Sequence, residues 1–232
     1  MAGPKQFGTT PPRNAPLIDA PRSVAELVER ASKLEGVPLE VVARDLGRVA
    51  VGVGLHAKGK TGELLEQALG ATGGSKARVD FPEIAVELKT LPLGASGRPR
   101  ETTFVCAVRV DEADTMEWET SWVREKLRRV LFVPISEDRR IGRSFLWQPS
   151  AEEDAVLRGD FDDIMGLIGV GRIEEVSAHL GTYLQLRPKA RDGAPRAVAF
   201  GRHGERIHTV PRGFYLRTTF TERLVASHTG PR

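Results

Sequence analysis

One short segment restricts the fold of this chain more than any other. Residues 130–135 read Val-Leu-Phe-Val-Pro-Ile, without a single charged side chain, and they follow a basic stretch, 121–129, that has the composition of a helix. A strand that is apolar on both faces needs cover on both faces, as in a sheet buried between other layers. The segment therefore predicts a layered protein with a strand deep inside it.

Helix and strand signals alternate along the rest of the chain without an internal repeat. Two capping boxes, Ser23 with Glu26 and Ser150 with Glu153, predict helix starts, and Thr61 predicts another. We expect helices over 24–34, 39–46, 61–69, 121–129 and 151–169, and strands over 84–91, 102–109, 130–135 and 183–187. This order predicts a mixed α/β or α+β protein, with a mixed central sheet flanked by helices.

Length and composition set broad limits on the class of protein. At 232 residues the chain is long enough for one large domain or two lobes. Residues 1–20 are expected to form a flexible tail and 21–232 the folded domain. No run approaches the roughly 18 apolar residues of a membrane span, and the tail lacks the apolar core of a signal peptide. We therefore expect a cytoplasmic protein that does not bind membranes.

Cysteine usage and charge exclude some kinds of site. Cys106 is the only cysteine, so neither an intrachain disulfide nor a zinc site of several thiolates can form. Its apolar neighbours predict a buried thiol. The five histidines show no metal-ligand spacing. The formal net charge is only +3, so the positions of the charges matter more than their sum.

The strongest candidates for chemistry lie between residues 80 and 89. The alternation of 84–88 predicts a strand that points Glu87 and Lys89 to the same side, with Asp80 in the preceding turn. Two carboxylates beside an ammonium can hold a hard divalent cation such as Mg²⁺, which commonly completes its shell with phosphate oxygens. Phosphodiester hydrolysis is the hypothesis that follows. The alternative is an ordinary ion pair on a solvated strand face.

A second group of candidates lies near the C-terminus. Arg187 and Lys189 flank Pro188, which fixes the backbone, and both cations suit phosphate or base-edge contacts. The segment 211–217 places aromatic residues among cations and predicts an edge that meets a nucleic acid. The alternatives are a charged strand end and aromatic side chains that only pack.

Longer segments give these patterns a family context. The spacing from Asp80 to Glu87-Leu88-Lys89 is that of the PD-(D/E)XK nuclease signature, with Val79 where that signature has a proline. An acid-x-lysine tripeptide alone has little specificity. Between residues 20 and 228, however, the chain resembles the MutH family of methyl-directed mismatch-repair endonucleases in nine segments that keep their order. These are 64–66, 70–76, 86–90, 97–99, 101–106, 126–131, 186–190, 204–207 and 211–216.

The resemblance implies a fold and an activity. The fold would be restriction-endonuclease-like, with two lobes around a DNA cleft. The activity would be Mg²⁺-dependent nicking of the unmethylated strand at hemimethylated GATC sites, immediately 5′ of the guanine. One or two Mg²⁺ ions would be bound, and Mn²⁺ or Ca²⁺ could replace them in binding. The enzyme would be stimulated by the ATPase MutL after the mismatch sensor MutS has engaged, and a monomer would suffice because a nick needs one active site.

The resemblance also assigns roles to individual residues. The implied metal ligands are Glu66, Asp80 and Glu87, the implied catalytic lysines are Lys89 and Lys126, and the implied DNA-binding residues are Lys58, Arg187, Pro188, Lys189 and Tyr215. Arg212, in the aromatic and basic segment near the C-terminus, joins the DNA-binding candidates. Without the resemblance, Glu66 reads as an exposed helix glutamate, Lys126 as a solvated helix lysine and Lys58 as a loop lysine.

Two other functions remain open from the sequence. One is a type II restriction endonuclease of the same fold that cuts GATC-like sites without repair partners. The other, from a different class, is a non-catalytic DNA-binding module that uses only the basic patches.

Overall fold

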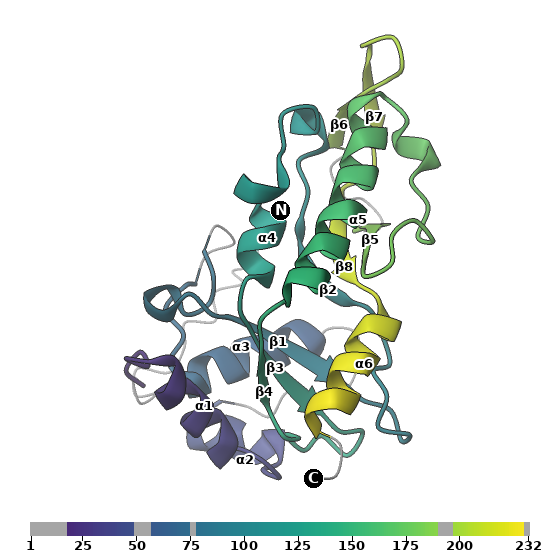
Figure 1. Ribbon diagram of the computed structural model, residues 1–232. Coiled ribbons are helices and arrows are strands. Elements are labelled where there is room, and N and C mark those ends of the chain that lie inside the picture. Colours follow the sequence, from purple (N-terminus) through teal and green to yellow (C-terminus); the bar gives the residue numbers. More distant parts are fainter. Residues whose placement is uncertain (1–17, 49–56, 75–77, 190–196, 230–232) are drawn as a thin grey trace, which may run out of the picture.

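The computed structural model describes residues 18–48, 57–74, 78–189 and 197–229 of the chain (Figure 1). The α-helices of these ranges are α1 (Val24–Lys33), α2 (Leu39–Asp45), α3 (Ala57–Leu69), α4 (Trp122–Leu127), α5 (Ala151–Gly169) and α6 (Thr218–Thr229). The strands are β1 (Glu87–Pro92), β2 (Thr103–Ala107), β3 (Val130–Ile135), β4 (Phe145–Trp147), β5 (Leu184–Pro188), β6 (Ala197–Phe200), β7 (Arg206–Thr209) and β8 (Arg212–Leu216). None of the helices in the described ranges is both long and apolar enough to cross a membrane.

The strands form three small sheets. In the order β1-β3-β4, β1 runs parallel to β3 and β4 runs antiparallel to it, so this sheet is mixed. A second sheet, β2-β8-β5, is antiparallel throughout, and β6 with β7 forms a hairpin. The mixed α+β class predicted from the sequence is confirmed.

The sheet β1-β3-β4 separates two apolar cores. Leu131 and Val133 of β3 pack in a core with α1, α2 and α3, whereas Val130 and Phe132 pack in the other core, which α5 and the sheet β2-β8-β5 complete. Every residue of β3 is buried. Alternate side chains of one strand thus enter different cores, which is why the segment 130–135 is apolar at every position.

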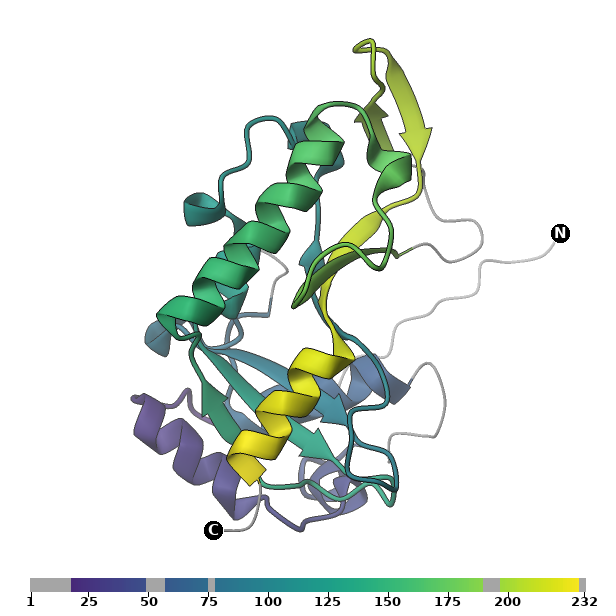
Figure 2. The same ribbon diagram turned by 45° about the vertical axis from the view of Figure 1, so that its right-hand side comes forward.

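The two cores correspond to two lobes. Helices α1 to α3 lie with the sheet β1-β3-β4 in one lobe, while α4, α5 and the strands β2 and β5 to β8 form the other (Figure 1). Helix α6 returns from the second lobe to the first and lies across its sheet (Figure 2). Ring contacts hold it there, since Phe220 packs on Trp147 and His228 stacks on Phe145.

The helix starts follow the sequence signals in part. The capping box of Ser150 and Glu153 is complete at the start of α5, as predicted. At α1 the Ser23 hydroxyl accepts from the Glu26 amide, but the Glu26 carboxylate accepts from the Arg22 amide instead of the Ser23 amide. The prediction that Thr61 caps α3 is wrong. The helix begins at Ala57, so Thr61 lies within the helix, where its side chain is buried.

The strand that carries Glu87 begins later than predicted. Residues 82–84 form a 3-10 turn and Ala85 has φ +50°, so β1 starts at Glu87 and not at 84. Phe81 and Val86 close this turn through two backbone hydrogen bonds of 2.9 and 3.1 Å. The turn reverses the chain just before β1 and brings Asp80 back beside the strand.

A buried carboxylate anchors the start of β5. Asp160 of α5 accepts hydrogen bonds from the backbone amides of Thr182, Tyr183 and Leu184, at 2.7, 2.6 and 2.8 Å. Gly181 has φ +89°, and a Cβ there would lie 2.1 Å from the Leu184 carbonyl oxygen, so the turn requires glycine. The anchor fixes the edge strand that leads to Arg187 and Lys189.

Candidate active site

A cavity of about 380 Å³ lies where the two lobes meet. Its walls come from α3, the turn before β1, β1 itself, β2, α4 and the residue after β5. The charged side chains that line it include Glu66, Asp80, Glu87, Lys89, Lys126 and Lys189. All five residues that the sequence predicted to be catalytic therefore share one cavity with one predicted DNA-binding lysine.

Glu87 is the centre of this group. Its side chain is 3% exposed, its Oε1 accepts a hydrogen bond from Lys89 Nζ at 2.6 Å, and its Oε2 accepts one from Lys126 Nζ at 2.7 Å. The prediction that Glu87 and Lys89 point the same way is confirmed. Two ammonium groups around one buried carboxylate satisfy a charge that would be costly to bury alone.

Lys126 reaches this carboxylate from α4. The helix has only six residues and is capped by Ser121, whose hydroxyl accepts from the Arg124 amide. Lys126 Nζ also donates to the Arg78 carbonyl oxygen at 2.7 Å, and its side chain is 8% exposed. A solvated helix lysine, the alternative left open by the sequence, is therefore excluded.

Asp80 is fixed by the backbone around it. Its Oδ2 accepts from the Leu88 amide at 2.8 Å, and its carbonyl accepts from the amides of Thr72 and Gly73. A Cβ at Gly73 would lie 2.1 Å from the Val79 carbonyl oxygen, so this close approach requires glycine. Burial and the charge of Glu87 raise the pKa of the Asp80 carboxyl.

Glu66 enters the cavity from α3. Its pKa is raised to about 7, first by burial and then by the negative charges of Asp80 and Glu87. The Glu66 side chain is half-buried and lines the cavity, so it is not the freely exposed helix glutamate that the sequence alone suggested. Carboxylates from three separate segments thus line one cavity, where their like charges repel.

The donor set suits a hard divalent cation. Carboxylate oxygens are the ligands that Mg²⁺, Mn²⁺ and Ca²⁺ prefer, and a cation would relieve the repulsion among Glu66, Asp80 and Glu87. In the present arrangement no three His, Cys, Asp or Glu side chains within the described residues converge closely enough to share a metal ion. Both carboxylate oxygens of Glu87 instead contact lysine ammonium groups. A bound cation would therefore have to share one of these oxygens with a lysine.

The candidates for DNA binding are only partly together. Lys189 Nζ lies 4.1 Å from the centroid of the Phe104 ring, which in turn packs edge-on against Tyr215. Arg187 is exposed and its Nη1 donates to Thr102 Oγ1 at 3.1 Å. Phe104 was not predicted from the sequence. The structure lines the cavity with its ring.

One of the remaining DNA-binding candidates differs from expectation. Arg212 is buried, with Nη2 3.7 Å from the Glu174 carboxylate and with no hydrogen-bond partner for Nε among the described residues. A direct DNA contact by Arg212 is therefore not supported, because its side chain is buried. The side chain of Lys58 lies outside the described residues. Pro188 ends β5, paired with Arg212 in the sheet.

Cys106 lies at the cavity wall and is buried, as predicted. Burial raises the pKa of its thiol to about 12, so the thiolate is not formed at neutral pH. It therefore has no place among the reactive groups.

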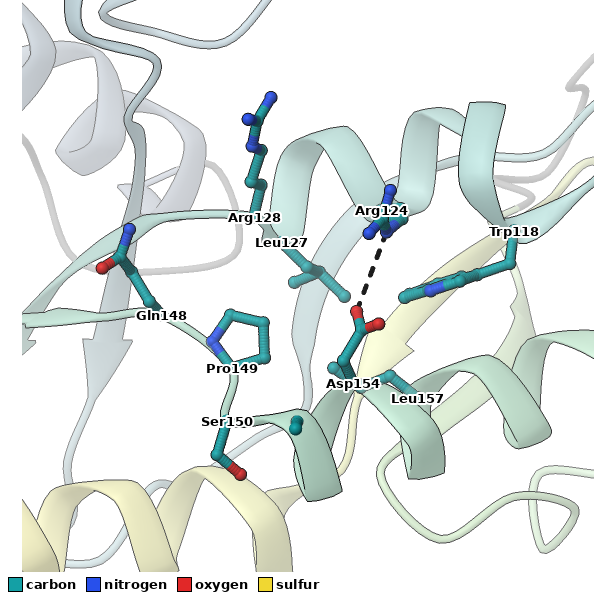
Figure 3. Close-up of a pocket in the computed structure, with 10 residues that line it drawn as sticks. Trp118, Arg124, Leu127, Arg128, Gln148, Pro149, Ser150, Asp154 and Leu157 are labelled. Carbon is teal, nitrogen blue, oxygen red and sulfur yellow. Dashed lines mark ion pairs between the residues drawn. The ribbon is translucent and has the colours of Figure 1, made fainter.

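A second cavity lies on the opposite face of α4. It has a volume of about 410 Å³ and lies between α4 and the start of α5, where Arg124 and Asp154 point toward each other at 3.8 Å (Figure 3). Trp118, Leu127 and Pro149 add apolar surface. None of the predicted catalytic residues lines this cavity. It is a useful position for control variants, because the same helix carries Lys126 on its other face.

Comparison with known proteins covers almost the whole chain. The family described as "DNA mismatch repair enzyme MutH" matches residues 69–160. The DNA mismatch repair protein MutH of Shigella flexneri serotype 5b (strain 8401) is 44% identical over 220 residues, which are 92% of this chain and 96% of that protein. The protein of the same name from Serratia proteamaculans (strain 568) is 44% identical over 222 residues, 92% of this chain and 97% of its own. The one from Escherichia coli (strain K12) is 43% identical over 220 residues.

Proposed function

We propose, for a chain that belongs to the MutH family of DNA mismatch repair enzymes and is therefore an endodeoxyribonuclease, a specific reaction at GATC sites. The enzyme nicks the unmethylated strand of a hemimethylated site, 5′ of the guanine. The reaction depends on Mg²⁺. The observation that carries this proposal is the cavity between the lobes, where Glu66, Asp80 and Glu87 gather with Lys89 and Lys126. We propose double-stranded DNA as the substrate, MutL as the activating partner downstream of MutS, and a monomer as the working form.

The proposed roles follow from the chemistry of phosphodiester cleavage. Asp80, Glu87 and Glu66 are the proposed ligands of one or two Mg²⁺ ions. When bound, Mg²⁺ polarises a phosphoryl oxygen and makes hydroxide available near neutral pH. Lys89, whose ammonium already lies 2.6 Å from Glu87, is proposed to orient the attacking water or to offset the charge that builds on the phosphorus. Lys126 is proposed to hold Glu87 in place from the other side.

The proposed reading surface lies next to the cavity, at the end of β5 and on the neighbouring strands β8 and β2. Arg187 and Lys189 flank Pro188 at the exposed end of β5, and Tyr215 lies on the neighbouring strand beside Phe104. Lysine and arginine favour the guanine acceptors of the major groove, and the ring of Tyr215 could contact an adenine methyl group. We therefore propose that Arg187, Pro188, Lys189 and Tyr215 recognise the site and its methylation.

One assay separates this proposal from its rivals. Strand breakage should be mapped on fully methylated, hemimethylated and unmethylated GATC duplexes, with and without MutL. We expect a nick in the unmethylated strand, strongest when MutL is present. Double-strand cutting that MutL does not change would favour a type II restriction endonuclease. No breakage of any duplex with Mg²⁺, Mn²⁺ and MutL present would favour a non-catalytic DNA-binding module.

The reading role of Lys189 leads to a prediction about specificity. Lys189→Ala is expected to lower the affinity for a GATC duplex about tenfold, as for the loss of one base contact, and to lower the affinity for a scrambled duplex less. Fluorescence anisotropy in Ca²⁺ measures both affinities.

The matched control is Lys33→Ala in α1, because Lys33 is exposed, pairs with Glu29 alone among the described residues and does not line the cavity. We expect its affinity to equal that of the wild type. Equal losses on both duplexes for Lys189→Ala would assign Lys189 to the phosphate backbone, and an unchanged affinity would contradict its DNA contact altogether.

A further inference from the structure

Two walls of the catalytic cavity each place a lysine over an aromatic ring. Lys189 Nζ lies over Phe104, and Lys126 Nζ lies 5.5 Å from the centroid of the Trp122 ring. Trp122 is one helical turn before Lys126 in α4, and both side chains line the cavity. The roles proposed above make no use of Trp122.

The ring adds to the contacts that hold the Lys126 ammonium in one place. This group donates to Glu87 Oε2 and to the Arg78 carbonyl oxygen, both at 2.7 Å. The aromatic face lies near the same ammonium, which is almost completely buried. Attraction between a cation and a ring is stronger when the cation has lost its water. Trp122 therefore stabilises Lys126 in the position where it contacts Glu87.

The position of the Lys126 ammonium beside Glu87 disfavours metal binding. Lys89 and Lys126 occupy both oxygens of Glu87, so a divalent cation can take one of these oxygens only beside an ammonium group. Two cations at one carboxylate repel each other at close range. Any contact that stabilises Lys126 against Glu87 thus lowers the affinity of the site for the metal.

We propose that Trp122 is a positioning residue that holds the Lys126 ammonium against Glu87, so that it weakens divalent-cation binding while it keeps Lys126 ordered for DNA cleavage. The inference rests on the proposed function and adds a residue to it. It predicts that loss of the ring changes metal affinity and cleavage in opposite directions. Damage to the fold of the cavity would instead weaken both.

The test compares two variants of the full chain. Trp122→Leu removes the aromatic face, whereas Trp122→Phe keeps a ring at the same place. Titration with Mn²⁺ without DNA is expected to give about two- to fivefold tighter binding for Trp122→Leu, the size expected for loss of one cation-ring contact in which the ring itself is only half-buried. The same variant should nick a GATC duplex more slowly at saturating Mn²⁺. Trp122→Phe should restore both values toward those of the wild type.

Arg124→Ala serves as the control, because Arg124 lies on the opposite face of α4 and lines the other cavity (Figure 3). Its Mn²⁺ affinity should match that of the wild type. Equal or weaker Mn²⁺ binding by Trp122→Leu would overturn the proposal. If Trp122→Leu does not fold, Trp122→Met gives the same comparison with a long side chain that lacks a ring.

A metal-free measurement tests the contact itself. Unfolding of Trp122→Leu, Lys126→Met and the double variant in EDTA gives the coupling between the two side chains. We expect the Trp122 substitution to cost less once Lys126 is gone, and additive costs would overturn the proposal. A wild type that lacks Mg²⁺-dependent nicking would instead count against the proposed function, since neither the coupling nor Mn²⁺ binding depends on cleavage.

Discussion

Replacement of Asp80 by alanine is expected to reduce Mg²⁺-dependent nicking by at least about a thousandfold, which corresponds to about 4 kcal/mol of transition-state stabilisation. Asp80 is held against β1 by the Leu88 amide and lines the cavity with Glu87, so its loss removes one fixed ligand of the proposed metal site. Duplex binding should remain close to that of the wild type, because the variant removes a negative charge from a surface that we propose to face DNA phosphates. Single-turnover cleavage and anisotropy in Ca²⁺ measure the two effects.

Asp45→Ala is the matched control for this variant. Asp45 ends α2 and is exposed, and within the described part of the chain its one ion pair is a contact of 3.4 Å with its neighbour Arg44. We expect its cleavage rate and DNA affinity to equal those of the wild type. Nicking by Asp80→Ala within tenfold of the wild-type rate would contradict the proposed role of Asp80 as a metal ligand.

The second large effect is expected on stability. Asp160→Ala should lower the free energy of unfolding by about 3–5 kcal/mol, because three backbone amides at the start of β5 lose their buried, charged acceptor. Urea denaturation followed by circular dichroism measures the change. Asp160→Asn should fall between alanine and the wild type, since its amide offers one acceptor oxygen and places a donor group toward the other amides.

Asp162→Ala provides the comparison for Asp160→Ala in the same helix. Asp162 is two residues further along α5 and is exposed, and its one ion pair with a described residue is a surface contact of 3.5 Å with Arg158. Such a pair contributes little, so the expected loss is below about 1 kcal/mol. If both variants lose the same free energy of unfolding, the three amide contacts of Asp160 do not contribute the stability that we expect of them.

The central part of the fold could be predicted because its signals are local. The apolar run 130–135 is a buried strand, and the capping box at Ser150 starts a long helix. Strand β4 has three residues and β6 and β7 have four each, too few for a periodic pattern to stand out. Helix α6 was missed as well, because only three apolar side chains, Phe220, Leu224 and Val225, mark its buried side.

The candidate site also contains residues that local sequence places and residues that only long-range contacts place. The spacing of Asp80, Glu87 and Lys89 was readable because one turn and one strand place them together. Lys126 and Phe104 reach the same cavity through contacts between distant segments, which no local pattern reports. Arg212 shows the opposite error, because a cation among aromatic residues suggested a surface contact and the side chain is buried.

The mixed sheet that lies between the two cores has a consequence for how the molecule comes apart. If the lobe of α1 to α3 unfolded alone, Leu131 of β3 would face water, and if the other lobe unfolded alone, Phe132 would. Exposure of these side chains is unfavourable in both cases, so we expect no stable state with only one lobe unfolded. Thermal denaturation of the metal-free chain should accordingly show a single sharp transition, with the same midpoint whether tryptophan emission or backbone ellipticity is followed.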